Sequence, residues 1–390
     1  MTMQPIEDTY DAIVVGARCA GSATAMLLAA SGMRVLVFDK SPLGADTLST
    51  HALMRPAVLL LHRWGLTERL AKEGTPPIRK TSFIYADHRR TNTVEVDIKP
   101  RLGVDALYAP RRTVLDRVLA DAARDAGAEV RHGVQMLDLL RTEEGRVSGV
   151  RLRDESGGTR EVRSGLVIGA DGRRSTVARL AGSTPYVVGR HTTSVAYRYF
   201  RDLPVDGNRW YFRPGMGGGA IPTNGGETCV FASVPHAFAS GPAADRAETF
   251  RQVLGQCAPD IAEALLSARA VSKLHFFPGL RGFLRQPWGD GWALVGDAGY
   301  MSDPITAHGI TNALRDAELL ARSIIEGNDL SEYQTARDDL SLQFFEISDR
   351  VASLDWDIPT VQHYHKMMSQ EMNREEEALV ALTDAPATAA

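Results

Sequence analysis

Apolar positions near the start of the chain follow a strand, turn, helix, strand pattern. Ala12-Ile13-Val14-Val15 is a short apolar run of the kind that is buried in a parallel sheet, and a turn from Gly16 to Gly21 follows it. The next residues predict a helix, and Arg34 to Phe38 predicts a second strand that ends at Asp39. This order of elements predicts a βαβ unit of the dinucleotide-binding type.

A similar pattern returns twice. Gly165 to Gly172 and Gly291 to Asp297 are apolar runs that each end in a tight acidic turn, and each predicts a further buried strand. Apolar residues at i, i+3 and i+4 predict helices at Ala52 to Trp64, Thr113 to Ala126 and Ile310 to Ile325. Strands that alternate with helices favour an α/β fold built on a parallel sheet.

Two other stretches follow a different pattern. Residues 78–98 alternate loosely between apolar and polar, and residues 186–284 are rich in aromatic and β-branched residues, with glycines clustered at Gly215 to Gly219. Both predict a mostly antiparallel sheet outside the nucleotide-binding unit. Residues 331–382 predict partly charged helices, and the low-complexity tail 383–390 is predicted to be disordered.

The glycine turn is suited to a phosphate group. The first turn of a helix carries unpaired N–H groups and a partial positive charge, which stabilise a pyrophosphate. Asp39 stands where an acidic residue accepts hydrogen bonds from a ribose. Arg18 stands where a second glycine usually lets the backbone approach phosphate, and we expect its charge to bind the pyrophosphate directly. The alternative is that Gly16 and Gly21 only form a tight turn.

Composition and charge exclude several classes of protein. The 390 residues are 44% hydrophobic and 24% charged, which is ordinary for a globular protein, and the net charge of −4 gives no electrostatic basis for binding nucleic acid. Three scattered cysteines indicate neither a disulfide framework nor a metal site, and they favour a reducing compartment. We see no signal-peptide pattern and no long apolar run, so we expect a cytoplasmic protein without integral membrane association.

Three motifs, taken together and in this order, resemble those of a known superfamily. Gly16 to Gly21 with Asp39, Gly169-Ala170-Asp171-Gly172, and Gly296-Asp297 are similar to the motifs of flavoprotein monooxygenases built on the p-hydroxybenzoate hydroxylase-like fold. The resemblance spans nearly the whole chain and implies FAD as cofactor. It implies a discontinuous Rossmann-like FAD-binding domain (1–77, 100–184 and 285–330), an antiparallel β-sheet substrate domain (78–99 and 185–284) and C-terminal helices (331–382).

The resemblance also implies roles for individual residues. Gly16 to Gly21 looks like the segment that binds the ADP half of FAD, Asp171 resembles a residue of the pyrophosphate region, and Asp297 resembles one that holds the ribityl chain. Arg112 looks like the family arginine near the pyrophosphate. The implied FAD-binding residues are Gly16, Ala17, Arg18, Cys19, Ala20, Gly21, Asp39, Lys40, Arg112, Asp171, Gly296, Asp297, Pro304, Gly309 and Ile310.

Pro304 to Gly309 leads into a predicted helix whose N-terminus would face the isoalloxazine. Its free N–H groups and dipole would stabilise negative charge on the pyrimidine edge of reduced flavin, which favours hydride acceptance. His51 and His308 are the candidate catalytic residues, because histidine titrates near neutral pH. A purely structural role for each histidine is the alternative.

The sequence departs from the family pattern in two places. Arg18 replaces a glycine, and Gly296-Asp297 continues as Ala298-Gly299-Tyr300 where many members have Ala-Ala-His. We see no second glycine-rich βαβ unit that could bind a nicotinamide. We therefore expect NAD(P)H to dock transiently over the flavin, or a separate flavin reductase to supply the electrons.

Several reactions are compatible with this cofactor. The first is a monooxygenase that uses NAD(P)H and O2 on a hydrophobic or aromatic small molecule. The second is a reductase or dehydrogenase, since Trp210 to Pro214 and the chain as a whole also resemble geranylgeranyl reductase-like proteins. A halogenase, suggested by half a signature at Asp355 to Pro359, and a non-catalytic FAD-binding protein are further alternatives. The candidate substrate-binding residues are Tyr197, Tyr199, Trp210, Phe212 and Gly218, with Gly215 to Gly219 expected to leave room for a bulky ligand.

Overall fold

The computed structural model describes residues 6–236 and 243–382. Its first sheet has the strand order β17-β18-β8-β1-β2-β5, and β7 and β6 extend it from β8. β1 is parallel to both β2 and β8, as expected of strands joined by helical crossovers. The strands are β1 (Thr9–Val15), β2 (Val35–Asp39), β5 (Glu129–His132), β6 (Gln135–Arg141), β7 (Val147–Arg153), β8 (Thr159–Gly169), β17 (Trp288–Gly289) and β18 (Trp292–Leu294).

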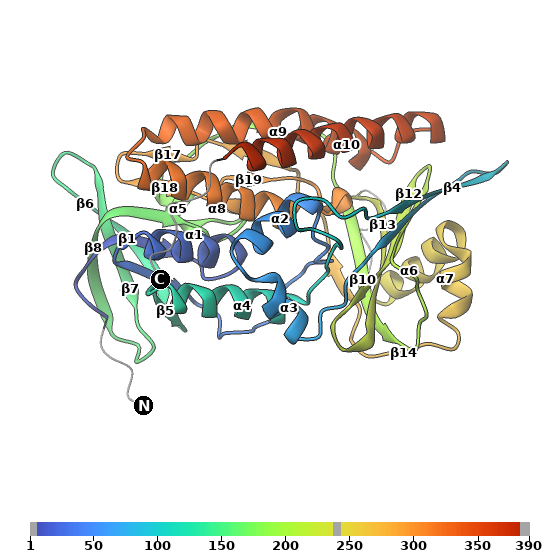
Figure 1. Ribbon diagram of the computed structural model, residues 1–390, viewed down its shortest axis with the longest axis horizontal. Helices are drawn as coiled ribbons and strands as arrows, with labels where there is room; N and C mark the ends of the chain where they lie inside the picture. The colour runs from blue at the N-terminus through green and yellow to red at the C-terminus, as the bar shows by residue number, and fades with distance from the viewer. Residues whose placement is uncertain (1–5, 237–242, 383–390) are drawn as a thin grey trace.

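Helices pack on one face of this sheet, with α1 between α4 and α8 (Figure 1). Val14 of β1 points into the core shared with these helices, whereas its neighbour Ile13 points into a smaller core under β6 and β7. The two faces are both buried, which explains the unbroken apolar run of β1. The helices of this part are α1 (Cys19–Ala30), α2 (Arg55–Arg63), α3 (Thr67–Lys72), α4 (Arg112–Asp125), α5 (Thr176–Ala181) and α8 (Gly309–Ile325).

A second sheet has the strand order β14-β10-β13-β12-β11-β3-β4, with β15 beside β10. Because side chains alternate across a strand, Tyr197 and Tyr199 face the first domain, whereas Ala196 and Phe200 pack beneath α6. The elements are β3 (Lys80–Ala86), β4 (Thr91–Asp97), β10 (Thr193–Arg201), β11 (Asn208–Arg213), β12 (Met216–Thr223), β13 (Glu227–Pro235), β14 (Arg269–Ala270), β15 (His275–Phe277), α6 (Ala243–Cys257) and α7 (Pro259–Ala264).

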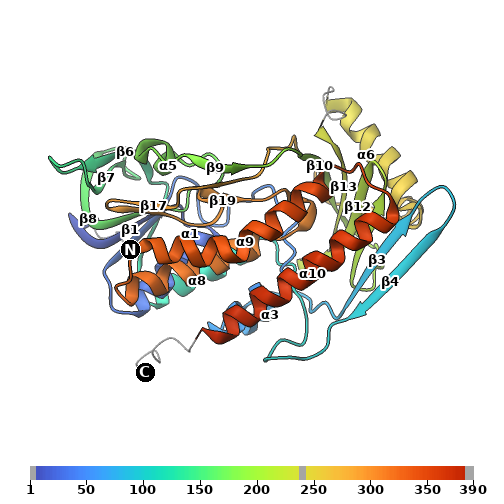
Figure 2. The same cartoon turned by 90° about the horizontal axis from the view of Figure 1, so that it is seen from above.

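A small third sheet and two long C-terminal helices join the two parts. The sheet consists of β9 (Pro185–Val188), β16 (Phe283–Arg285) and β19 (Tyr300–Met301) in the order β19-β16-β9. α9 (Leu330–Ala352) lies beside α8, and α10 (Ile358–Ala381) crosses from the second sheet to α2 (Figure 2). The C-terminal helices therefore contact both the predicted cofactor domain and the predicted substrate domain.

The α/β fold class predicted from the sequence is confirmed, with one correction. The helix predicted from Ala52 begins at Arg55, because Leu53 pairs with Tyr108 in an isolated bridge and keeps this stretch extended. The second sheet is mostly antiparallel, as predicted, and β11 runs parallel to β3. The domain boundary predicted at 284 falls within β16, and the predicted disordered tail 383–390 lies outside the described residues.

Candidate flavin site

Gly16 and Gly21 allow backbone segments to meet at the first motif. Gly16 has φ of +107°, and a Cβ there would lie 2.4 Å from the carbonyl oxygen of Ala170. A Cβ on Gly21 would lie 1.7 Å from the carbonyl oxygen of Gly16. Neither position can hold a larger residue without moving the backbone. The backbone of the first motif therefore packs directly against the turn that follows β8.

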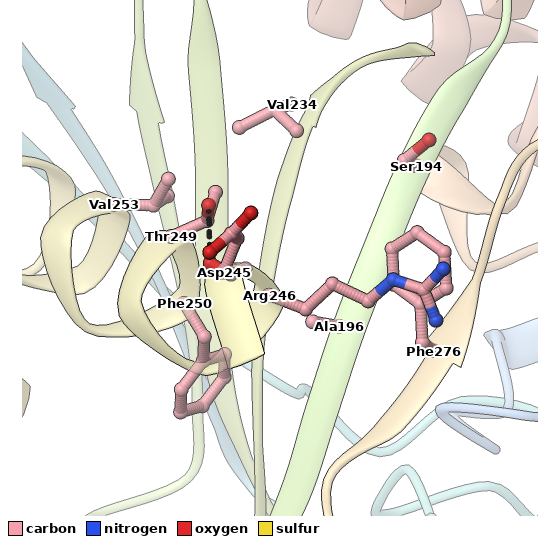
Figure 3. A pocket seen from close by; sticks show the side chains of 10 residues that line it. Ser194, Ala196, Val234, Asp245, Arg246, Thr249, Phe250, Val253 and Phe276 are labelled. Carbon is pink, nitrogen blue, oxygen red and sulfur yellow. Dashed lines mark hydrogen bonds between the residues drawn. The ribbon is translucent and has the colours of Figure 1, made fainter. Parts of the chain in front are cut away.

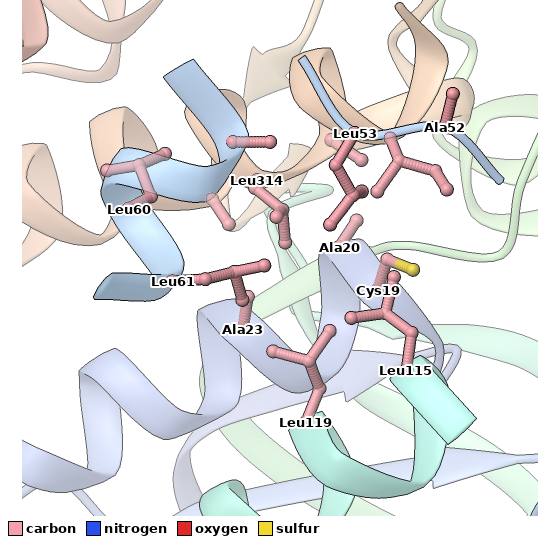
Figure 4. Close-up of a cluster of buried hydrophobic side chains, with 14 of the residues drawn as sticks. Cys19, Ala20, Ala23, Ala52, Leu53, Leu60, Leu61, Leu115, Leu119 and Leu314 are labelled. Atoms are coloured by element: carbon pink, nitrogen blue, oxygen red, sulfur yellow. The ribbon is translucent and has the colours of Figure 1, made fainter. Parts of the chain in front are cut away.

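Gly296 brings the third motif to the same place. It has φ of +60°, and its Cβ would lie 2.8 Å from the Cβ of Ala20 and 3.4 Å from that of Ala313. Ala20 is in the first turn of α1 and Ala313 is near the start of α8, so two helix N-termini converge here. Figure 4 shows Cys19 and Ala20 at the start of α1, among side chains from the neighbouring helices such as Leu115 and Leu314. No side chain caps α1 and its first turn contains no acid, so its N–H groups suit an anion.

Asp39 fixes the loop that follows β2. Its Oδ2 accepts a hydrogen bond from the backbone N–H of Ala17 at 3.1 Å, and its Oδ1 accepts one from Ser41 at 2.8 Å. The side chain is half-buried, whereas Lys40 is exposed. Asp39 therefore lies beside the glycine turn, where the sequence predicts a ribose.

Asp116 organises the positive charge beside this turn. Its carboxylate accepts hydrogen bonds from Arg112 at 2.9 to 3.0 Å and from the Cys19 thiol at 3.1 Å, and Nη1 of Arg18 lies 3.4 Å away. Burial raises the pKa of Cys19, which keeps the thiol protonated as the donor. Two arginines face this one carboxylate, so guanidinium donors lie beside the glycine turn, where a pyrophosphate would accept hydrogen bonds from them.

The acidic residues of the second and third motifs differ in their surroundings. The Asp171 carboxylate accepts hydrogen bonds from Ser175 and from the N–H groups of Thr176 and Val177, at the N-terminus of α5. We therefore expect Asp171 to shape the turn rather than to contact the cofactor with its side chain. Burial raises the pKa of Asp297, and the nearby charges of Arg112 and Arg173 partly offset the rise.

The segment from Pro304 to Gly309 connects this site to the second sheet. Asp303, directly before it, accepts hydrogen bonds from the N–H and hydroxyl of Thr193, the first residue of β10, at 2.8 and 2.6 Å. Pro304 begins a short 3-10 turn, and α8 starts at Gly309, one residue before Ile310. We call residues 303–308 the flavin loop, because they span from the two converging helix ends to the aromatic sheet.

The two candidate catalytic histidines lie in different surroundings. His51 is 2% exposed, has φ of +50° and leaves both ring nitrogens without a hydrogen-bond partner among the described residues. Burial and the charge of Arg111 lower the pKa of His51 to about 3, so its ring is neutral at physiological pH. His308 is also buried, and its Nε2 lies 2.8 Å from Oε2 of Glu375 in α10.

The aromatic substrate candidates line the face of the second sheet that points toward the first domain. The Tyr199 ring is stacked on His51 with centroids 5.7 Å apart, and Tyr197 is stacked on His275 at 4.8 Å. Arg111 lies over Tyr199, 3.7 Å from the ring centroid. Trp210 and Phe212 belong to the same face but lie further along the sheet, where Phe212 contacts His365 of α10.

Gly218 does not lie with these residues, because it faces the other side of the sheet. It pairs with Ala232 across β12 and β13, and the alternation of side chains turns it toward Leu254 of α6. The expected room at the glycines is also filled, because the ring of Phe231 covers Gly219. On this outer face, a cavity of about 60 Å³ lies between the sheet and α6 (Figure 3), separate from the tyrosines.

Sequence reasoning missed several residues of the site. Arg111 links the aromatic face to Asp46 and Glu227 at 3.0 and 2.8 Å, and its pairing with Arg112 in the sequence was the available signal. Glu375 had no local signal, because its partner His308 is 67 residues away. His275 likewise meets Tyr197 only through the pairing of β15 with β10.

The residues present fit a dinucleotide, since glycine backbone, uncapped helix ends and excess arginine meet at one edge of a parallel sheet. Residues 9–341 match the sequence family described as FAD binding domain. The chain belongs to this family. It is therefore an FAD-dependent oxidoreductase, and FAD is its cofactor.

Known relatives divide between two chemistries. Digeranylgeranylglycerophospholipid reductase 1 of Methanococcoides burtonii is 28% identical over 339 residues, which cover 84% of this chain and 78% of that protein. The probable electron transfer flavoprotein-quinone oxidoreductase YdiS of Escherichia coli is 27% identical over 355 residues, which cover 85% of this chain and 80% of that protein.

Solved structures share the fold at lower identity. The flavin-dependent brominase Bmp2 has a TM-score of 0.75 and 20% identity, with 97% of this chain and 94% of that chain covered. PqsL, a probable FAD-dependent monooxygenase from Pseudomonas aeruginosa, has a TM-score of 0.73 and 19% identity, with 94% and 100% covered. The chain thus shares its fold with a probable flavoprotein monooxygenase and is similar in sequence to geranylgeranyl reductases, the two groups that its motifs resemble.

The half signature of a halogenase has a structural explanation. Trp356 is buried and donates a hydrogen bond to the carbonyl of Val351, and Asp357 caps the N-terminus of α10. Both residues therefore form the connection between α9 and α10.

Within residues 6–236 and 243–382, no helix is long and apolar enough to span a membrane.

Proposed function

We propose that the protein is a flavoprotein monooxygenase that uses NAD(P)H and O2 to oxygenate a hydrophobic or aromatic small molecule. The observation that carries this proposal is the compact aromatic face of Tyr197, Tyr199, His51 and His275 beside the flavin loop. Stacking at 4.8 and 5.7 Å, with Arg111 over Tyr199, holds these rings in fixed positions, so they can form one rigid aromatic wall of a substrate site. FAD, when bound, would supply the hydride and oxygen chemistry.

The chain's own residues would orient the substrate and exclude water. Burial raises the pKa of Tyr197 to about 12, so its hydroxyl stays protonated and can donate a hydrogen bond. That hydroxyl also accepts from the N–H of Ser49 at 3.2 Å, which fixes the loop before His51. His51 itself is neutral, so its ring can accept or donate a hydrogen bond without adding charge to an apolar site.

A basic cleft supports direct reduction by NAD(P)H. It has a volume of about 550 Å³ and is lined by Arg190, His191, His236 and Arg281, among others. Cationic side chains of this kind bind phosphate groups. Thr192 also lines the cleft, and the next residue holds Asp303 of the flavin loop. A docked nicotinamide would therefore lie close to the predicted flavin position.

A second candidate is a reductase that saturates isoprenoid double bonds. It is supported by the digeranylgeranylglycerophospholipid reductases, which are 27 to 29% identical to this chain over most of its length. Trp210 and Phe212 on the inner face would then contact a lipid chain. The compact, partly polar surroundings of the two tyrosines favour the first candidate, because a polyprenyl chain needs a long apolar channel.

The two candidates are separated by isotope incorporation. The purified holoprotein would be given NADH or NADPH under ¹⁸O₂ with a panel of phenols and other aromatic acceptors. One labelled oxygen atom in a product supports the monooxygenase, and unlabelled products with all acceptors contradict it. Anaerobic saturation of a geranylgeranyl double bond supports the reductase. If only an added flavin reductase permits turnover, the proposed direct use of NAD(P)H is wrong.

A further inference from the structure

Helix α10 supplies a buried acid to the residue that ends the flavin loop. Oε2 of Glu375 lies 2.8 Å from Nε2 of His308, and the two side chains are 3% and 1% exposed. Ala307, directly before His308, has φ of +51°, a conformation that a non-glycine residue keeps only when its surroundings hold it. The C-terminal helix therefore takes part in fixing this loop.

Glu375 is held as a carboxylate. Burial acts to raise its pKa, but the facing His308 and Arg315 outweigh burial, so that its pKa lies below the ordinary value. Nη1 of Arg315 lies 3.1 Å from Oε1 of Glu375, and Arg315 also binds Asp316 and Ser341. Since a carboxylate only accepts hydrogen bonds, Nε2 of His308 must carry the hydrogen.

The other ring nitrogen of His308 has no partner among residues 6–236 and 243–382. Nδ1 is buried and forms no hydrogen bond with any of the described residues. The ring of Phe344 packs against the imidazole, with centroids 4.4 Å apart. Buried polar atoms are almost always hydrogen-bonded in folded proteins, so Nδ1 is available to a bound ligand or an ordered water.

The position of the loop indicates which ligand this is. The predicted pyrophosphate site lies at the turn that begins with Gly16, and Gly296 of the predicted ribityl motif packs against it. The aromatic face lies beyond Thr193, where Asp303 anchors the loop. A dinucleotide that extends from the first place to the second passes the start of α8. His308 is the residue that precedes this helix start.

We propose that Nδ1 of His308 contacts the polar edge of the isoalloxazine, and that Glu375 is the positioning residue that sets the orientation of the imidazole. The proposal rests on FAD binding, which family membership establishes, and is independent of the reaction proposed above. It gives α10 a role in the electronic properties of the cofactor. Hydrogen bonds at the edge of the ring tune those properties.

The test is a double-mutant cycle whose readouts are the midpoint potential and the visible spectrum of the bound flavin. We would measure the two-electron midpoint potential and the visible spectrum of holoprotein with His308→Ala, Glu375→Ala and both together. Each single substitution is expected to change the reduction equilibrium at least tenfold, or about 30 mV for a two-electron couple. The double variant is expected to match His308→Ala, because Glu375 acts through His308.

Matched substitutions separate this role from a structural one. His308→Asn carries a polar atom near the place of Nδ1 and is expected to keep the potential closer to wild type than His308→Gln does. Glu376→Gln, the buried neighbour on the same helix, is the control and should leave spectrum and potential unchanged.

Three results would overturn the proposal. The first is an unchanged midpoint potential in Glu375→Ala together with a lower melting temperature. The second is that the changes in potential of the two single variants add up in the double variant. The third is an equal potential for His308→Asn and His308→Gln. If Glu375→Ala does not fold, Glu375→Gln replaces it, because its amide oxygen still accepts from Nε2. Its potential should then lie nearer that of wild type than that of His308→Ala, and a potential equal to that of His308→Ala contradicts the positioning role.

Discussion

Arg112 and Asp116 form a two-pronged ion pair one turn apart on α4, with Nε and Nη2 of Arg112 at 3.0 and 2.9 Å from Oδ1 of Asp116. The same carboxylate accepts the hydrogen of the Cys19 thiol, so it joins α4 to the first turn of α1. Asp116 thereby links α4 to the start of α1 beside the predicted pyrophosphate site.

Asp116→Asn is expected to destabilise the apoprotein more than the holoprotein. The substitution leaves Arg112 buried without its counter-charge, which costs about 3 to 5 kcal/mol in comparable cases. A bound pyrophosphate would supply negative charge to Arg112 and reduce this loss. Urea unfolding with and without FAD measures both values. Equal losses would contradict a pyrophosphate beside Arg112, and the exposed Asp125→Asn on the same helix is the control.

Arg18→Ala is expected to weaken FAD binding by more than threefold, which is about 0.7 kcal/mol. Arg18 stands at the N-cap of α1, and its side chain is 29% exposed beside Asp116, so its charge is available to a phosphate. Titration of the apoprotein with FAD measures the change. Arg34→Ala removes an exposed arginine at the start of β2, away from the glycine turn, and should bind FAD normally. Affinity within threefold of wild type contradicts a direct contact by Arg18.

His51 should make the protein sensitive to acid. Burial lowers its pKa from 6.5 in the unfolded chain to about 3, so the folded state binds fewer protons than the unfolded state between these values. Above pH 6.5 the titration of His51 therefore costs no stability. As the pH falls from 6.5 toward 3, the unfolded state takes up the proton first, and the free energy of unfolding decreases by up to about 5 kcal/mol.

His51→Gln should reduce the loss of stability between pH 7 and pH 4, measured by urea unfolding. The same shift places the titration of His51 outside the range of pH 5 to 9. The pH profiles of kcat/KM for wild type and His51→Gln should consequently have the same shape, even if their heights differ. If the kcat/KM profile of wild type has an inflection near pH 6.5 that is absent from the profile of His51→Gln, His51 titrates with an ordinary pKa and the prediction is wrong.

Arg281→Ala is expected to raise the KM for NAD(P)H about tenfold and to leave FAD affinity unchanged. A charge-assisted hydrogen bond to phosphate is worth about 1.5 kcal/mol or more, and Arg281 lines the basic cleft beside the flavin loop. Stopped-flow reduction of the flavin at several NAD(P)H concentrations measures the effect. Arg269→Ala, which removes an exposed arginine outside this cleft, is the control. An unchanged KM would place the nicotinamide elsewhere.

The sequence predicted those parts of the site that depend on local backbone shape. Gly16, Gly21 and Gly296 could be recognised because each precedes or follows an apolar strand at a fixed spacing, and the structure places all three at one edge of the sheet. The apolar stripe of α8 likewise predicted a helix that begins within one residue of its observed start.

The parts that depend on distant contacts could not be predicted. Glu375 and His308 meet only through the tertiary fold, because they are 67 residues apart, and no short-range pattern marks Glu375. Gly218 was misplaced because a run of glycines hides the alternation that tells the two faces of a strand apart. The sequence suggested an acid–base role for His51. Its burial, which lowers its pKa, results from the tertiary fold and cannot be seen in the local sequence.

Phe231→Ala should enlarge the substrate site and broaden its specificity. Gly219 pairs with both Trp210 and Phe231, and a Cβ on Gly219 would lie 2.4 Å from the Phe231 ring, so this ring occupies the space above the glycine. Removing it leaves a cavity on the inner face, at a cost of about 3 to 5 kcal/mol in stability.

We expect the Phe231→Ala variant to oxidise NAD(P)H with bulkier acceptors that wild type rejects, because the new space adjoins the aromatic face. Thermal unfolding measures the cost, and NAD(P)H oxidation across a series of acceptors of rising size measures the specificity. Tyr211→Phe, on the opposite face, loses only its hydroxyl bond to Asp260 and is the control. If the size limit of the acceptors is unchanged in a folded Phe231→Ala variant, the substrate does not reach this part of the sheet, and the site is confined to Tyr197 and Tyr199.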